Sequence, residues 1–221
     1  MRYKVYNVGS GWDGGWILNH EIVSNPIDAD VITFPGGSDI HPSLYGEKVG
    51  SRTYAHQALD EIQLEYAINP AYKDKIKVGL CRGAQLLTAI SGGKLVQHFT
   101  SHNGSHRIMI NNDPENQVLV NSLHHQMMYP FNLDPNTFDL IGRACDHKGL
   151  AISTSFYNGE DAIIDMPKDK YGYIEPEIVF YKNTKSLCFQ FHPEMMSWER
   201  NPATLTLCNE LLNHYYAKNS K

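Results

Sequence analysis

The sequence predicts an α/β fold in which a mostly parallel β-sheet carries helices on both faces. Strand-like and helix-like segments alternate through the first hundred residues, which is typical of a parallel sheet. A denser series of short apolar runs between residues 106 and 156 indicates an antiparallel or mixed extension of the sheet. No repeat, low-complexity stretch or linker divides the chain, so we expect a single domain over residues 1–221.

The expected strands are short apolar runs rich in β-branched and aromatic residues. They occupy residues 3–9, 30–37, 76–81, 107–111, 117–122, 138–144, 149–156 and 186–194. Residues 54–72 carry an imperfect helical stripe, and residues 83–93 form a helix that stops at a pair of glycines. The last helix begins at Pro202, with Asn201 as its N-cap. Residues 157–177 are expected to form an acidic loop, either a lid or a docking surface.

Composition and charge exclude several classes of protein. No apolar run approaches the roughly 20 residues that a membrane-spanning helix needs, and the N-terminus lacks the apolar core of a signal peptide. A formal net charge of −5 without a basic cluster argues against nucleic acid as a partner. We therefore expect a cytoplasmic enzyme or small-ligand binder with neither nucleic acid nor membrane as a partner.

The cysteines and histidines outside the main motifs favour structural roles. The four cysteines are far apart, which predicts reduced thiols; Cys145 is the one expected to be exposed. His98, His102 and His106 recur every four residues, a spacing that can bind zinc on a helix. However, a Gly at position 104 breaks such a helix, so we expect surface or pocket-lining histidines, with no metal and no cofactor.

The stretch "KVGLCRGAQLL" (77–87) places Cys81 between an expected strand and an expected helix. Gly79 and Gly83 stand two residues before and after it, which is the spacing of a nucleophile elbow. A thiol at the N-terminus of a helix is favoured as the reactive thiolate by the helix dipole. The alternative is a buried structural cysteine, which is common in proteins.

A thiol nucleophile needs a base and a group that orients the base. The stretch "CFQFHPEMM" offers His192 and Glu194, whose side chains point to the same side of an extended segment. The earlier stretch "FPGGSD" ends a strand in Gly36 and Gly37, which leave bare backbone N–H groups at the carboxyl edge of the sheet. The N–H groups of this turn could form one half of an oxyanion hole, and the N–H group of Arg82 could form the other half.

Four motifs together, "PGGSD…P…YGE", "GLCRGAQ", "VNSLHHQ" and "FQFHPE", resemble the class I glutamine amidotransferase superfamily. The resemblance is greatest to its γ-glutamyl hydrolase branch, such as the γ-glutamyl-γ-aminobutyrate hydrolases. It implies a flavodoxin-like three-layer sandwich and cleavage of a γ-glutamyl amide through a thioester. It also implies a triad of Cys81, His192 and Glu194, with an oxyanion hole formed by the backbone of Gly37 and Arg82.

The resemblance implies further contacts to a small-molecule γ-glutamyl substrate. They are made by Gly36, Gln85, His124 and Gln126. One alternative keeps the chemistry but makes the chain a glutaminase subunit that supplies ammonia to a separate synthetase or amidoligase. Another is a binding module of the same fold without catalysis, against which the intact Cys81, His192 and Glu194 argue.

Overall fold

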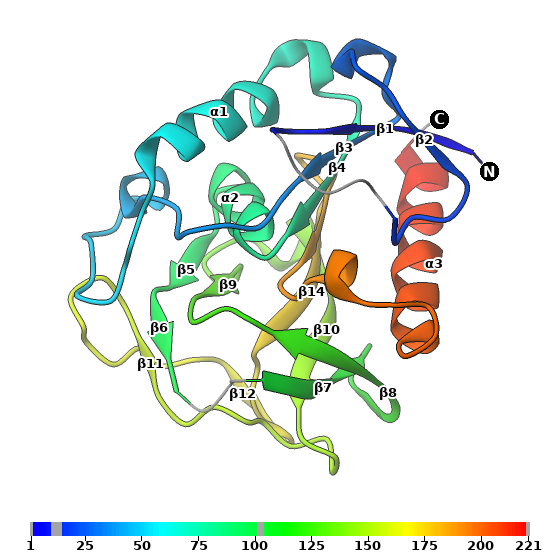
Figure 1. Ribbon diagram of the computed structural model, residues 1–221. Coiled ribbons are helices and arrows are strands. Elements are labelled where there is room, and N and C mark those ends of the chain that lie inside the picture. The colour runs from blue at the N-terminus through cyan, green and yellow to red at the C-terminus, as the bar shows by residue number, and fades with distance from the viewer. Residues whose placement is uncertain (1, 10–14, 101–103, 220–221) are drawn as a thin grey trace.

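The computed structural model describes residues 2–9, 15–100 and 104–219, and a nine-stranded sheet forms its centre (Figure 1). The strand order is β2–β1–β3–β4–β15–β14–β10–β7–β8. These strands are β1 (Tyr3–Asn7), β2 (His20–Ile22), β3 (Val31–Phe34), β4 (Ile76–Leu80), β7 (Gly104–Ile110), β8 (Asp113–Ser122), β10 (Phe138–Cys145), β14 (Pro176–Tyr181) and β15 (Ser186–Phe189).

The sheet has a parallel half and an antiparallel half. Strands β2, β1, β3, β4 and β15 pair in parallel, and β14, β10, β7 and β8 continue the sheet in antiparallel pairs. The predicted α/β architecture with a mixed extension is therefore confirmed. Three small two-stranded sheets complete the described strands: β5 (Lys94–Val96) with β9 (Met127–Tyr129), β6 (His98–Phe99) with β11 (Phe156–Tyr157), and β12 (Lys168–Asp169) with β13 (Gly172–Tyr173).

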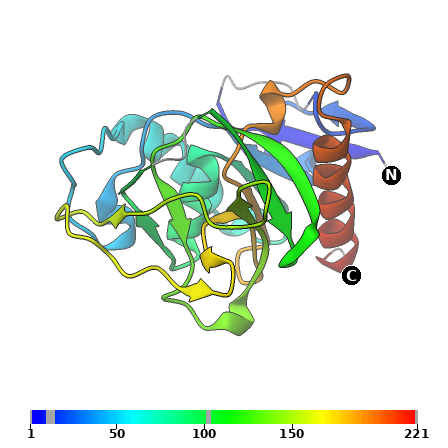
Figure 2. The same cartoon turned by 90° about the horizontal axis from the view of Figure 1, so that it is seen from below.

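Helices cover the two faces of the sheet and make the three expected layers (Figures 1 and 2). Helices α1 (Gln57–Ala67) and α2 (Arg82–Ile90) share one hydrophobic core with the sheet. Helix α3 (Pro202–Asn219) packs Leu205, Cys208 and Leu212 into a second core on the opposite face. Pro202 is the first residue of α3, as predicted, because its fixed φ suits the first turn of a helix.

The region between residues 149 and 181 differs from expectation. Only Phe156 of the expected strand 149–156 is in a strand, where it begins β11. The expected loop 157–177 ends inside β14, a fully buried strand that lies between β15 and β10. Glu175 and Glu177, expected on a lid or docking surface, are fully buried instead.

The structure also places several individual side chains. All four cysteines are free and buried, so the expected exposure of Cys145 is wrong; burial raises the pKa of its thiol to about 11. Trp16 is a core residue that packs edge-on against Phe189. His102 lies outside the described residues. Within the described part of the chain, no helix is both long and apolar enough to cross a membrane.

Candidate active site

Cys81 lies at the junction of β4 and α2, at the carboxyl end of a central strand. Its backbone has φ 50° and ψ −107°, a left-handed conformation that costs a non-glycine residue energy and is concentrated at functional sites. The turn also needs a bare position two residues later, because a Cβ on Gly83 would lie 2.0 Å from the carbonyl oxygen of Phe34. The sequence therefore folds locally into a strained, closely packed strand–turn–helix elbow with a thiol at its tip.

His192 follows β15, the parallel neighbour of β4, and its ring is held by a carboxylate. Its Nδ1 lies 2.7 Å from Oε1 of Glu194, so Nδ1–H donates to Glu194 and Nε2 is left available for a reacting partner. Asn121 of β8 holds the backbone of His192: Oδ1 accepts the His192 N–H at 2.8 Å and Nδ2 donates to the His192 carbonyl at 2.8 Å. Both the ring and the main chain of His192 are thus fixed.

The protonation of His192 is set by its neighbours. Burial alone would lower the pKa of the imidazole, but hydrogen bonds and charge interactions with Cys81 and Glu194 outweigh burial and raise the pKa to about 10. The imidazolium is therefore the favoured form at neutral pH. A thiol in contact with an imidazolium at a helix N-terminus has the surroundings in which cysteines act as nucleophiles.

The loop after β3 lies against both side chains. A Cβ on Gly36 would meet His192 Cε1 at 2.6 Å and Cys81 Cβ at 3.6 Å, so only a glycine lets the backbone approach this closely. Among the residues that the structure describes, the backbone N–H groups of Gly37 and Arg82 have no hydrogen-bond acceptor. Strands β3, β4 and β15 are adjacent and parallel, so their carboxyl ends bring the glycine loop, the thiol and the imidazole together.

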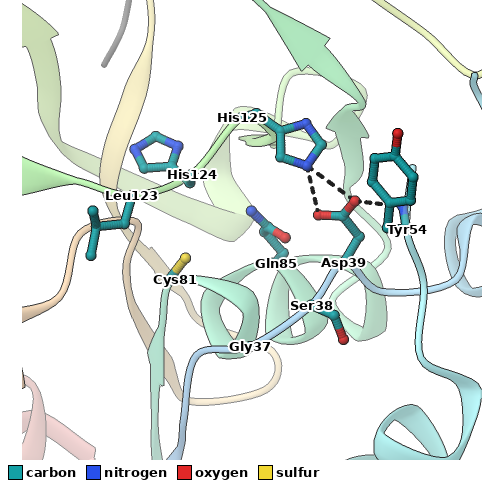
Figure 3. Close-up of a pocket in the computed structure, with 9 residues that line it drawn as sticks. All are labelled: Gly37, Ser38, Asp39, Tyr54, Cys81, Gln85, Leu123, His124 and His125. Atoms are coloured by element: carbon teal, nitrogen blue, oxygen red, sulfur yellow. Dashed lines mark hydrogen bonds and ion pairs between the residues drawn. The ribbon is translucent and has the colours of Figure 1, made fainter. Parts of the chain in front are cut away.

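A pocket of about 190 Å³ opens above Cys81 (Figure 3). It is lined by Gly37, Ser38, Asp39, Tyr54, Cys81, Gln85, Leu123, His124 and His125. In Figure 3 the thiol of Cys81 and the amide of Gln85 point into the space between the 37–39 loop and the 123–125 segment. The pocket therefore joins three of the four sequence motifs.

The predicted contact residues are placed differently from one another. Gln85 and His124 line the pocket, and both hydrogen-bond to the backbone carbonyl of Gln126, Gln85 through Nε2 at 3.2 Å and His124 through Nδ1 at 2.9 Å. Burial lowers the pKa of His124 despite the neighbouring carboxylate of Glu177. Gln126 itself is not among the lining residues; its amide donates to Thr53 Oγ1 at 3.1 Å.

Several pocket residues were not predicted from the sequence as site residues. The carboxylate of Asp39 lies 3.1 Å from His125 Nε2 and accepts the backbone N–H of Tyr54 at 2.8 Å. Tyr54, with 74% of its surface exposed, and Leu123, with 64%, are largely apolar groups at the pocket's edge. Asp39 and His125 each lie inside one of the quoted motifs, "PGGSD" and "VNSLHHQ", which is the signal that could have indicated them.

The described part of the chain also has a second cavity, with a volume of about 230 Å³. His98 lines it, and the rings of His98 and His125 are 6.2 Å apart between centroids. Its lining consists of Ser51, Arg52, His98, Thr100, Tyr157 and Asp161. His98 thus lines a pocket, which is one of the two predicted placements, surface or pocket lining. Nε2 of His106 lies 3.4 Å from Oε1 of the buried Glu177.

Comparison with known proteins places the chain in a family. Residues 18–133, just over half of the chain, match the family described as peptidase C26. The chain belongs to the peptidase C26 family. The matched region includes the glycine loop, Cys81 and His124, and it ends before His192. Membership indicates a hydrolase of the glutamine amidotransferase-like type.

Curated relatives support the same type. The glutamine amidotransferase-like protein YvdE of Lactococcus lactis is 24% identical over 214 residues, which cover 82% of this chain and 77% of that protein. A Schizosaccharomyces pombe protein named as a glutamine amidotransferase, PB2B2.05, is 32% identical over 126 residues, 47% of this chain and 49% of its own length.

Solved structures show the same fold as this C26 member. PurLQS from Thermotoga maritima aligns with a TM-score of 0.56 at 15% identity, over 97% of this chain and 99% of that one. A Thermoplasma acidophilum protein described as a subunit of a GMP synthase aligns with a TM-score of 0.55 at 15% identity. The alignment covers 99% of this chain and 98% of that one. At this identity the likeness establishes the fold, including its flavodoxin-like layering, and no more.

Proposed function

We propose that this C26 member is a cysteine-dependent hydrolase of γ-glutamyl amide bonds. The observation that carries the proposal is the position of His192, buried between the Cys81 thiol and the Glu194 carboxylate beside a pocket that Cys81 lines. A nucleophile, a base and an orienting carboxylate in this order are the components of acyl transfer through a covalent intermediate.

In the first half of the reaction the Cys81 thiolate attacks the δ-carbonyl carbon of the γ-glutamyl group. The carbonyl π electrons move to oxygen, and the N–H groups of Gly37 and Arg82 stabilise the oxyanion. His192, as imidazolium, gives its proton to the departing amine as the C–N bond breaks, which leaves a γ-glutamyl thioester on Cys81.

In the second half, neutral His192 removes a proton from water, and the hydroxide formed attacks the thioester carbonyl. The same two N–H groups stabilise the second oxyanion. Collapse of this intermediate breaks the C–S bond, releases glutamate and restores the thiolate–imidazolium pair. Glu194 keeps Nε2 directed at the thiol in both halves, because Nδ1–H stays on the carboxylate.

The polar side chains of the pocket suit the amino-acid end of a γ-glutamyl group. Gln85, one helical turn after Cys81, offers an amide to the glutamyl group, and Asp39 carries a negative charge suited to an α-ammonium group. Tyr54 and Leu123 give the edge of the pocket apolar walls.

A substrate panel tests the proposal. The purified chain is incubated with glutamine and with several γ-glutamyl amines, and released glutamate is measured for the wild type and for Cys81→Ala. We expect hydrolysis of at least one compound by the wild type and a loss of about 10³-fold or more in Cys81→Ala. No glutamate release from any compound by the folded wild type would contradict the proposal.

Including glutamine in the panel distinguishes the proposed hydrolase from the alternative, a glutaminase subunit that supplies ammonia to a synthetase. That alternative predicts weak glutamine hydrolysis by the chain alone and strong activation by a synthetase partner. It is supported by the names of the relatives as glutamine amidotransferase-like proteins. Efficient hydrolysis of a γ-glutamyl amine without any partner would exclude it.

A further inference from the structure

The side chain of Arg82 is buried next to the elbow, and its role is not explained by the backbone N–H that it supplies. The residue has 1% of its surface exposed, and its guanidinium makes two hydrogen bonds to helix α1: one to Asp60 Oδ1, which is also an ion pair, and one to Gln63 Oε1. Asp60 and Gln63 are buried too, with 2% and 0% exposed. These three polar side chains form a connection between the elbow and α1.

Both α1 partners of Arg82 also bind the two ends of the glycine loop, which comprises residues 35–41. The second oxygen of Asp60 accepts the backbone N–H of His41 at 2.9 Å, and Nε2 of Gln63 donates to the carbonyl of Pro35 at 3.4 Å. Between these two points the loop rests on Arg82 itself, since a Cβ on Gly37 would lie 3.2 Å from Arg82 Cδ.

The connection therefore joins the two backbone segments that supply the N–H groups of the proposed oxyanion hole. One N–H belongs to Arg82, on the elbow, and the other to Gly37, on the loop between Pro35 and His41. The segments follow different strands, β4 and β3, and lie far apart in the sequence. Because an oxyanion hole works only with both donors about 2.7–3.1 Å from the oxyanion, the spacing of the segments must be fixed.

We propose that Asp60 and Gln63 are positioning residues that set the distance between the Arg82 and Gly37 N–H groups through the Arg82 guanidinium. The inference rests on the proposed function in one respect, namely that these N–H groups stabilise an oxyanion. It assigns no contact with the substrate to Asp60 or Gln63. The proposal also gives a reason for an arginine directly after Cys81, because the guanidinium of Arg82 reaches α1.

Gln63 is the better residue to test, because replacing Asp60 would leave the Arg82 charge buried without its counter-ion and could unfold the protein. Gln63→Met keeps the length of the side chain and removes both the acceptor for Arg82 and the donor to Pro35. The matched control is Gln57→Met, the same substitution at an exposed position on the same helix. Gln63→Glu is the second variant, since it keeps an acceptor for Arg82 and loses the donor to Pro35.

Two reactions of the same thiol separate oxyanion stabilisation from other effects. Acylation of Cys81 by 4-nitrophenyl acetate forms an S–C bond through an oxyanion and expels 4-nitrophenolate, which is followed as a burst. Alkylation by iodoacetamide displaces iodide at a saturated carbon and forms no oxyanion. Cys81→Ala gives the background of both reactions, and circular dichroism verifies that every variant is folded.

We expect Gln63→Met to slow the burst about 10-fold or more while alkylation changes by less than about 2-fold, and Gln57→Met to match the wild type in both. If Gln63→Met is not folded, the same selective loss is expected of Gln63→Glu. Equal slowing of both reactions would overturn the inference in favour of an effect on the thiol or on the fold. Unchanged rates in the folded variants, or the absence of a burst in the wild type, would also overturn it.

This experiment is independent of the natural substrate. If the wild type gives the burst but hydrolyses no γ-glutamyl amide, the proposed function fails and the positioning role stands or falls on the Gln63 variants. If γ-glutamyl amides are hydrolysed, Gln63→Met is expected to lower kcat about 10-fold or more with KM within about 2-fold, because the substrate-binding groups are untouched.

Discussion

His192 shows how one side chain can be held in a charged form inside a protein. Burial disfavours the imidazolium and would lower the pKa of His192. The pKa is nevertheless raised to about 10, because Cys81 and Glu194 both contact the ring. Asn121 makes two hydrogen bonds to the main chain of His192, which fix the backbone that carries the ring. Glu194 thus contributes to both the charge and the orientation of the imidazole, whereas Asn121 fixes the main chain of His192.

Glu194→Gln tests the charge of His192. In the proposed mechanism, deprotonation of the imidazolium removes the proton that the leaving amine needs. Wild-type kcat/KM for an amide substrate is therefore expected to fall as pH rises through about 10. Removing the Glu194 charge lowers the pKa of His192, and we expect the alkaline limb of the profile to move down by about 1 pH unit or more. The control is Glu199→Gln, which replaces an exposed glutamate that follows Glu194 in the sequence. An unmoved limb in Glu194→Gln would contradict this account.

At this scale the candidate reactive groups could be proposed from the sequence, but the groups that hold them could not. Cys81, His192 and Glu194 could be proposed because their chemistry and spacing are local, and the structure places the three side chains together. Asn121 and Asp60 were not, because each acts through a contact with a residue far along the chain, 71 positions away for Asn121 and 22 for Asp60. A buried amide or carboxylate that hydrogen-bonds to a distant residue leaves no pattern in its own neighbourhood.

The elbow between β4 and α2 is an element whose shape depends on close backbone contacts. Cys81 has a positive φ, and its N–H donates to the carbonyl of Phe189 at 2.8 Å, which ties the elbow to β15. The helix begins directly after it and packs against β3 without a side chain at Gly83. The strained turn is therefore maintained by its neighbours on both sides.

Gly83→Ala tests this packing. The new Cβ would lie 2.0 Å from a backbone oxygen, that of Phe34, so α2 or β3 must move. We expect a loss of about 1–3 kcal/mol in the free energy of unfolding, measured by urea denaturation, together with a strong loss of activity. In the control Gly46→Ala no atom lies within 4 Å of the new Cβ, and the positive φ of 72° alone is expected to cost about 1 kcal/mol with activity retained. Equal stability losses in the two variants would argue against the clash.

Strand β14 shows why one element of the sheet was not predicted. All of its residues are buried, so it lacks the alternation of a half-exposed strand, and Glu177 interrupts its apolar run. The acidic residues that precede it favoured a loop over the whole of 157–177. The parallel strands β1, β3, β4 and β15 were predictable because glycine or polar turns mark their ends. The short parallel strand β2 was not predicted, and β14 is defined by its two neighbours in the sheet.

Across the whole molecule, two buried groups make stability depend on pH in opposite ways. The pKa of His192 is raised to about 10, so its contribution to stability is complete below its unfolded pKa of about 6.5 and is lost as pH rises through about 10. Lys77 lies in β4 with 2% of its surface exposed, and burial lowers the pKa of its amine to about 8. Between pH values of about 8 and 10.5, Lys77 therefore carries a proton in the unfolded chain that it has released in the folded protein. The folded state becomes more stable as pH rises through this range.

Lys77→Met separates the two contributions. Between pH of about 8 and 10 the wild-type contributions oppose each other, so the free energy of unfolding is expected to change less steeply with pH than in Lys77→Met. The difference in slope approaches about 1.4 kcal/mol per pH unit at most, the value for one proton. Urea denaturation at a series of pH values measures it, and Lys73→Met, which replaces an exposed lysine, is the control. Parallel curves for Lys77→Met and the wild type would refute this assignment.

The position of β15 has a consequence for biosynthesis. The strand that precedes His192 comes last along the chain among the nine described strands of the central sheet, yet it inserts between β4 and β14 in the middle of that sheet. A nascent chain that has already emerged through α2 carries Cys81 but neither His192 nor the Phe189 carbonyl that binds the elbow. Cys81 therefore gains its contacts with His192 and with the Phe189 carbonyl only when this later segment inserts into the sheet.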